Sequence, residues 1–149
     1  MDKTLLGTKA GISAGVICGL ISQTLHTLGM GRICMVKTAS AFYSQQVLTA
    51  TKFSGWTILG WTGHLIISAV LGVILVYLFS ALGKEYAWLK GMMFGALVWI
   101  FDYGFVGPLS GFILPGMLPR DYFIVLGYHL LFGLIAAWYI MRYSHVQES

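Results

Sequence analysis

The chain has 149 residues, of which 58% are hydrophobic and only 9% are charged. Soluble domains carry about 25% charged residues, so this chain has too few polar side chains to cover a surface that faces water. The composition excludes a soluble globular domain and predicts an integral membrane protein embedded in the lipid bilayer. The net charge of +4 comes from lysine and arginine residues scattered singly along the chain. Without a basic run, this charge does not indicate binding to nucleic acid.

Four apolar segments are long enough to cross a bilayer as helices, since one crossing takes about 20 residues. They cover residues 10–29, 57–80, 90–107 and 122–141. The third is the shortest because two glycines and a proline occur between Gly104 and Pro108. The sequence therefore predicts an all-α polytopic membrane protein. We expect a single transmembrane domain over residues 1–149, with four helices in an antiparallel bundle.

The segments that join the spans differ in length and character. Residues 30–56 form the longest loop, and its mixture of aromatic, aliphatic and polar side chains predicts a short interfacial helix at residues 40–50. Residues 83–86 form a tight turn. Residues 107–119 are too apolar for a solvated loop and too rich in proline and glycine for a helix. We expect this segment to dip back into the membrane interface, as a simple loop or as a lid over a site.

An even number of spans places both termini on one side of the membrane. That side carries Lys3, Lys9, Lys84, Lys90 and Arg142, and the other side carries Arg32, Lys37, Lys52 and Arg120. Because lysine and arginine are enriched in cytoplasmic loops, the excess of five over four favours termini in the cytoplasm. The sequence thus predicts a multi-pass protein of the cell membrane.

Glycine dominates the first span. Gly7, Gly11, Gly15 and Gly19 stand four residues apart and form a glycine zipper on one face of the helix. Such small residues let two helix backbones approach closely, which promotes helix association in lipid. The zipper packs either on another helix of the same chain or on a second copy in a homo-oligomer.

The spans also repeat in pairs. The odd spans share one spacing, with Gly15, Gly19 and His26 in the first and Gly91, Gly95 and Asp102 in the third. The even spans share another, with His64, Ser68 and Gly72 in the second and His129, Gly133 and Ala137 in the fourth. These repeats predict two tandem helical hairpins with corresponding residues at similar depth.

Ionisable side chains are rare inside the spans. Asp102 is the only acidic residue there, and three of the four histidines accompany it. A charged aspartate at the centre of a bilayer costs about 2.5 to 3.5 kcal/mol, so it normally faces a partner or water. Helical periodicity places all four side chains on small-residue faces at a similar depth. We therefore expect an intramembrane polar cluster of His26, His64, Asp102 and His129.

This cluster is compatible with four roles. Asp102 could simply hydrogen-bond a histidine across the bundle, which satisfies both groups in lipid. Three imidazoles and a carboxylate also suit zinc or another divalent metal. His64 and His129 suit the two axial ligands of a haem b, with small residues one and two turns away making room for the ring. The fourth role is a relay or path for protons or ions.

Residues 88–91 (WLKG), 94–99 (FGALVW), Pro108 and residues 129–133 (HLLFG) form a pattern of glycine-rich spans joined by a proline-bearing loop. In this pattern the second half of the chain resembles the uncharacterised four-span bacterial membrane proteins of the YqhR-like type. The resemblance implies a protein of the bacterial inner, or cytoplasmic, membrane. It supplies no catalytic residues.

No segment matches a phosphate-binding loop, a nucleophile elbow or a zinc-protease helix, so a non-enzymatic role is favoured and no catalytic residue is assigned. Our first hypothesis is a structural or partner-binding protein that assembles through small-residue helix faces, as a homo-oligomer or within a membrane complex. The second is a haem- or metal-binding subunit of a redox complex. The third is a small ion or solute transporter that uses Asp102.

Overall fold

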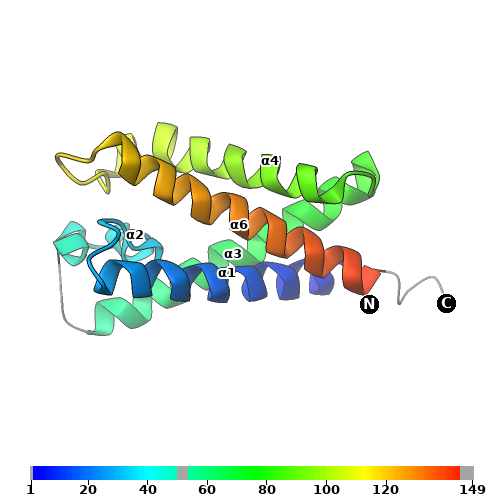
Figure 1. The fold of residues 1–149 in the computed structure, drawn as a ribbon. Coiled ribbons are helices and arrows are strands. Elements are labelled where there is room, and N and C mark those ends of the chain that lie inside the picture. The colour runs from blue at the N-terminus through cyan, green and yellow to red at the C-terminus, as the bar shows by residue number, and fades with distance from the viewer. Residues whose placement is uncertain (1, 50–53, 145–149) are drawn as a thin grey trace.

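A computed structural model describes residues 2–49 and 54–144 and arranges them as a bundle of helices (Figure 1). The long helical segments are α1 (Lys3–Thr27), α3 (Gly55–Leu82), α4 (Ala87–Ile100) with its continuations η2 (Phe101–Val106) and α5 (Gly107–Ser110), and α6 (Pro119–Ser144). In the described residues, four helical segments are long and apolar enough to cross a membrane. The prediction of an all-α membrane protein with four spans is confirmed.

The four spans form two antiparallel hairpins, one of α1 and α3 and one of α4 and α6. Contacts are most numerous within each hairpin, α1 also packs on α6, and α3 barely touches α4. The start of α1 and the end of α6 lie together at what we call the terminal end of the bundle (Figure 1). The opposite end, which carries residues 28–49 and 111–118, is the loop end. The predicted arrangement of two tandem hairpins is confirmed.

Close backbone contacts between small residues hold each hairpin together. In the first hairpin, a Cβ atom placed on Gly72 would lie 2.7 Å from the Cα atom of Gly11. In the second, a Cβ atom placed on Gly133 would lie 2.7 Å from the carbonyl carbon of Gly91. Atoms that are not bonded do not approach so closely, so these crossings require glycine. The faces that carry Gly7, Gly11, Gly15, Gly91 and Gly95 are therefore covered within the chain.

The helices extend a few residues beyond the predicted spans because their caps lie outside the apolar segments. The Asp2 carboxylate accepts a hydrogen bond from the backbone N–H of Leu5 at 3.0 Å and starts α1 well before residue 10. Ser54 and Thr57 form a reciprocal capping box at the start of α3. Gly83 has a φ of 77°, which ends α3 because few other residues adopt this conformation.

The third span also runs further than its predicted end at residue 107. The backbone N–H of Gly107 donates to the carbonyl of Asp102, five residues back, so η2 is a π-helical turn. Pro108 follows in the first turn of α5, where a missing N–H does not interrupt the helix. Gly111, with a φ of 71°, then ends the segment.

The loop end is folded onto the bundle. The short helix α2 (Met35–Ala41) begins before the predicted interfacial helix at residues 40–50 and buries Val36 and Ser40 against α3. It is followed by the 3₁₀ turn η1 (Gln45–Thr49), while residue 50 and Lys52 lie outside the described residues. Phe112, in the loop after α5, is only 4% exposed and packs its ring edge against Tyr103. These segments close one end of the bundle.

Candidate functional site

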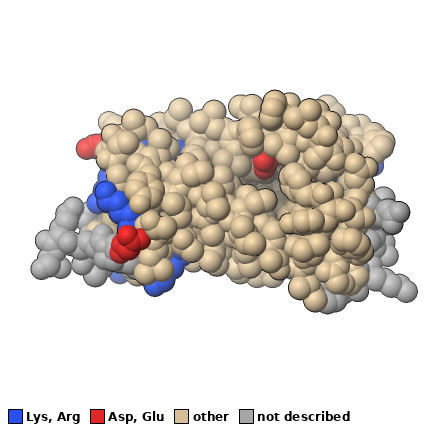
Figure 2. All heavy atoms as spheres, turned by 180° about the vertical axis from the view of Figure 1, so that it is seen from behind, with Lys and Arg blue, Asp and Glu red and all other residues tan. Residues whose placement is uncertain are grey.

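A cavity of about 90 Å³ lies in the half of the bundle nearer the loop end. Figure 2 shows the side of the molecule formed by α3 and α4, where an acidic patch stands beside a hollow in a stretch of otherwise uncharged surface. The cavity walls come from α2, α3, α4 with η2, α6 and the loop after α5. The lining residues are Met35, Thr38, Ala39, Phe42, His64, Ile67, Ser68, Leu71, Val98, Asp102, Phe112, His129 and Phe132.

The depth of the cavity follows from the positions of its histidines along their helices. His64 is the tenth of the 28 residues of α3, and His129 is the eleventh of the 26 residues of α6. At a rise of 1.5 Å per residue, they lie about 14 to 15 Å from the loop-end starts of these helices. Since each helix crosses the membrane, the ionisable groups of the cavity lie inside the bilayer.

Asp102 and His129 form a directly bonded pair. The Nε2 atom of His129 lies 3.3 Å from the Oδ2 atom of Asp102, and its Nδ1 atom lies 2.9 Å from the carbonyl oxygen of Val125. The imidazole is almost completely buried, whereas 39% of the Asp102 side chain is exposed. Tyr103 packs edge-on against the imidazole and helps to hold its plane.

The partners of His129 determine how many protons the pair holds. The Val125 carbonyl can only accept, so the Nδ1 atom of His129 carries a proton and donates it. A hydrogen bond between Nε2 and the Asp102 carboxyl group then needs a second proton, which lies on either the nitrogen or the oxygen. In both arrangements the two side chains share one proton and have no net charge.

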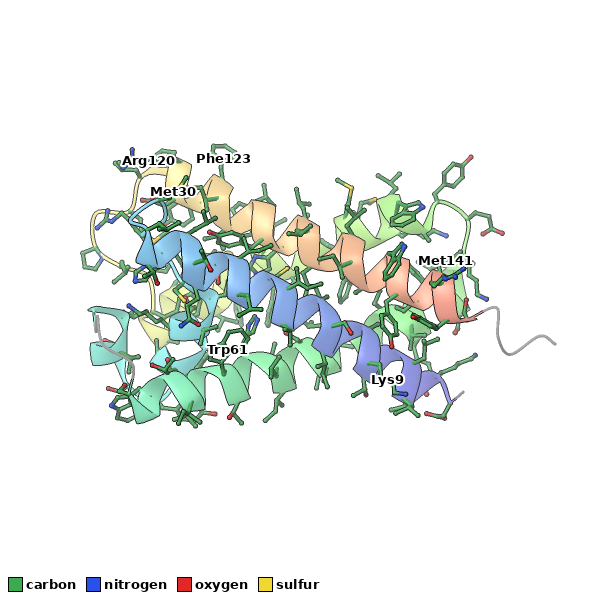
Figure 3. All side chains as sticks on the ribbon, turned by 60° about the horizontal axis from the view of Figure 1, so that its bottom comes forward. Lys9, Met30, Trp61, Arg120, Phe123 and Met141 are labelled. Carbon is green, nitrogen blue, oxygen red and sulfur yellow. The ribbon has the colours of Figure 1, made fainter. Side chains whose placement is uncertain are left out.

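His64 lies on the opposite wall of the same cavity. Its Nε2 atom lies 2.9 Å from the carbonyl oxygen of Gly15 and donates to it, which leaves Nδ1 as the acceptor of the neutral ring. Trp61 packs edge-on against this imidazole and donates a 2.9 Å hydrogen bond to Gln23. Figure 3 shows Trp61 between α1 and α3. Gly19 makes room for it, since a Cβ atom there would lie 2.7 Å from the indole ring.

His26 does not line the cavity with the other three predicted residues. Its Nδ1 atom donates to the carbonyl of Gly31 at 3.1 Å, and its Nε2 atom accepts a hydrogen bond from Lys37 at 2.8 Å. Burial lowers the pKa of Lys37 from its ordinary value, an effect that Cys34 partly opposes. The structure thus brings His64, Asp102 and His129 together and places His26 in a separate pair at the loop end.

The described residues fit a metal or a haem poorly. They contain no group of three histidine, cysteine, aspartate or glutamate side chains placed to hold a metal ion. Both ring nitrogens of His129 are already hydrogen-bonded, and so is the Nε2 atom of His64. A cavity of about 150 Å³ holds one benzene molecule, so the 90 Å³ between these histidines does not admit a haem.

Sequence reasoning did not find the residues of α2 or the π-helical turn. Thr38 and Phe42 reach the cavity because α2 packs on α3, and no periodicity in residues 30–56 indicated this. The π-helical turn had a sequence signal in Gly104, Gly107 and Pro108, which follow Asp102 closely. Such turns are frequent at functional sites because they displace a side chain from regular helical geometry.

The loop after α5 is held against the loop end by Arg32. Its guanidinium group donates to the carbonyls of Pro115 and Gly116 and lies 3.9 Å from the carboxylate of Asp121. Asp121 is buried, accepts a hydrogen bond from the backbone N–H of Leu118 at 2.9 Å and lies 4.0 Å from Arg120. Since Phe112 lines the cavity from this loop, Arg32 indirectly maintains one cavity wall.

No family model matches the chain, and comparisons with characterised proteins and with solved structures find no match. The resemblance of residues 88–133 to YqhR-like proteins stays a prediction. Function is therefore inferred from the chemistry of the cavity.

Proposed function

We propose that this protein is a small membrane transporter in which Asp102 and His129 bind and release a proton. The observation that carries the proposal is the pairing of a partly exposed carboxyl group with a buried imidazole at membrane depth. A purely structural hydrogen bond in lipid would be expected to bury both groups. Here the carboxyl group faces a cavity, where it can exchange its proton with a ligand or with water.

Electrostatics explains why the proton can be coupled to another species. With the shared proton, the pair is neutral overall, and without it the pair has one net negative charge. An uncompensated charge is unfavourable in a medium of low dielectric constant. Loss of the proton is therefore expected when a cation or water enters the cavity. A change in occupancy and a change in protonation become linked events.

The packing of the bundle supports access from one direction at a time. Toward the terminal end, the bundle is filled by a core that includes Leu6, Ala10, Leu75, Phe79 and Ala136. The sparse contact between α3 and α4 leaves the hairpins with little to hold them together on that side. A relative movement of the two hairpins is the expected route to the opposite side. With the termini in the cytoplasm, the cavity lies in the outer half of the membrane.

The alternative of a self-assembling structural protein has less support. That hypothesis relied on small-residue helix faces that would join two copies or a partner. In the structure these faces pack α1 on α3 and α4 on α6, so an assembly would have to use another surface. The cofactor alternative also has less support, because three of the four ring nitrogens of His64 and His129 are hydrogen-bonded within the chain and the cavity is too small for a haem.

Infrared spectroscopy tests the proton site without knowledge of the substrate. In protein reconstituted into nanodiscs, a change of pH should alter the carbonyl band of a protonated carboxyl group or the ring bands of histidine. Asp102→Asn should remove this pH-dependent change and leave the helical amide band intact. Glu85→Gln is the matched control, because Glu85 is an exposed acid in the turn between α3 and α4.

A flux measurement tests transport itself. Vesicles that contain the protein and a trapped pH indicator are given gradients of sodium, potassium or choline. We expect at least one gradient to change the internal pH in wild-type vesicles, and Asp102→Asn to abolish this change. Equal responses from wild type, Asp102→Asn and protein-free vesicles would refute a transport role for Asp102.

A further inference from the structure

We infer that the cavity binds a small organic ammonium ion and that each bound ion displaces the proton shared by Asp102 and His129. The inference depends on the proposed proton site and adds the class of ligand that competes with the proton. Three observations carry it: the charge of the cavity, the chemistry of its walls and its size.

The charge of the cavity favours a ligand with a single positive charge. Once the shared proton has left, the Asp102 carboxylate is the one formal charge among the described residues that line the cavity, with the histidines neutral. The titratable groups near its carboxyl group are His129 from α6, His64 from α3 and the neighbouring Tyr103, while α2 contributes no titratable lining residue. A monovalent cation beside Asp102 would therefore restore the neutrality that loss of the proton removes.

The walls favour an organic cation over a metal ion. A hard metal cation such as calcium or magnesium needs about six or more oxygen ligands. In the described part of the chain, the side chains that line this cavity provide oxygens only from Thr38, Ser68 and Asp102. The remaining wall is largely apolar and includes Phe42, Phe112 and Phe132, whose ring faces attract alkylammonium groups.

The cavity volume limits the size of the ammonium group. Its 90 Å³ is smaller than the roughly 150 Å³ that accommodates a benzene molecule. A primary ammonium group fits this volume whole. A trimethylammonium group is about as large as benzene, so it would place only part of its methyl groups in the cavity, with the rest in the hollow between α3 and α4 (Figure 2). A cation that carries several aromatic rings would not fit without a large rearrangement of the hairpins.

The exchange balances in charge and atoms. Before binding, the Asp102 carboxyl group and the Nε2 atom of His129 hold one proton between them. After binding, the carboxylate contacts the ammonium ion, His129 is neutral with its proton on Nδ1, and one proton has left for the solvent. No covalent bond forms, and the net charge of the cavity is zero both before binding and with the ammonium ion bound.

Titration calorimetry with choline measures both the affinity and the number of protons. Titrations at one pH in two buffers with different ionisation enthalpies give the protons released per bound ion, which we expect to be close to one. While the pair is protonated in the free protein, the dissociation constant should fall about tenfold for each unit increase in pH. The neutral isostere 3,3-dimethylbutan-1-ol has nearly the same shape and should bind at least tenfold more weakly.

Substitutions in the cavity provide the second arm of the test. Asp102→Asn should weaken choline binding at least tenfold and abolish proton release. Phe112→Leu should weaken it several-fold through loss of an aromatic ring, whereas Phe123→Leu should have no effect. Phe123 is the matched control because it is 69% exposed and lies at the outside of the loop end (Figure 3).

The possible results separate the inference from the proposed function. If Asp102 and His129 titrate in the infrared experiment but choline does not bind, the inference is wrong and the proton site stands. Equal binding of choline and the neutral isostere would also overturn it, because charge would then play no part. If the infrared bands do not respond to pH in an Asp102-dependent way, both proposals fail.

Discussion

Replacing Gly133 by alanine should destabilise the protein by separating α4 from α6. A Cβ atom at this position would lie 2.7 Å from the carbonyl carbon of Gly91 and 3.3 Å from the backbone nitrogen of Gly95. The carbonyl oxygen of Gly91 lies closer still, and carbon atoms in van der Waals contact are about 3.5 to 4.0 Å apart, so the two helices must move apart by more than about 1 Å. Overpacking of this kind costs about 1 to 3 kcal/mol.

Gly127 provides a matched control in the same helix. A Cβ atom there would have no neighbour within 4 Å, so Gly127→Ala adds a methyl group without a clash. Alanine in a helix is more favourable than glycine by about 0.5 to 1 kcal/mol. Both variants gain this propensity, so it cancels between them, and their free energies of unfolding should differ by the overpacking cost of about 1 to 3 kcal/mol, with Gly133→Ala the less stable.

Equilibrium unfolding in mixed detergent micelles, followed by far-ultraviolet circular dichroism, measures this difference. Both variants are compared with wild type under identical micelle compositions, so that the detergent contribution cancels. Equal stability of Gly133→Ala and Gly127→Ala would refute the close contact of α4 and α6. Loss of helix in both variants would instead show that α6 tolerates no change.

Three further predictions concern the loop end and the core. The hydroxyl of Tyr128 is buried without a hydrogen-bond partner in the described part of the chain. Tyr128→Phe should therefore leave the melting temperature unchanged or raise it, with a gain in the free energy of unfolding of at most about 3 kcal/mol. A clear drop in melting temperature would reveal a hydrogen-bond partner of the hydroxyl. The pKa of Lys37 is lowered in the folded protein. Between this lowered pKa and the ordinary lysine pKa, Lys37 is therefore protonated more fully in the unfolded chain than in the folded protein. Stability should therefore increase with pH through that interval, and Lys37→Met should show a smaller increase in the same thermal unfolding series. Arg32→Ala removes the hydrogen bonds to the carbonyls of Pro115 and Gly116. Amide hydrogen exchange in residues 111–118 should become several-fold faster, while the free energy of unfolding should change by less than about 1 kcal/mol. Unchanged exchange would show that Arg32 does not hold this loop.

The arrangement of the spans was largely predictable because it depends on strong local patterns. Twenty apolar residues define a crossing, and repeated glycines define the helix faces that meet. The same periodicity placed Asp102 and His129 at a common depth on facing surfaces, and they are bonded in the structure. Depth and helix face together were sufficient to identify this pair.

The loop end was less predictable because its structure depends on tertiary contacts. The residues of α2 that pack on α3 include Val36 and Ser40, which carry no periodic pattern strong enough to distinguish burial from an interfacial position. The expected common depth is wrong for His26, which lies in the last turn of α1, far beyond the level of Gly15 where His64 is bonded. There it bonds to Gly31 of the following loop and to Lys37 of α2. Helical periodicity describes spans and gives no information about the chain that folds back on them.

The two-hairpin arrangement has a consequence for biosynthesis. The backbone contact between Gly11 and Gly72 involves only the first two spans, so this hairpin can close while the second half is still being synthesised. Ala10 and Ala14 of α1 belong to a core shared with Ala136 and Ala137 of α6, which is synthesised after the other three spans. Until α6 arrives, α1 presents a strip of small residues to the lipid. During that interval the protein depends on lipid packing, or on an insertion factor, to protect a surface that the finished molecule buries.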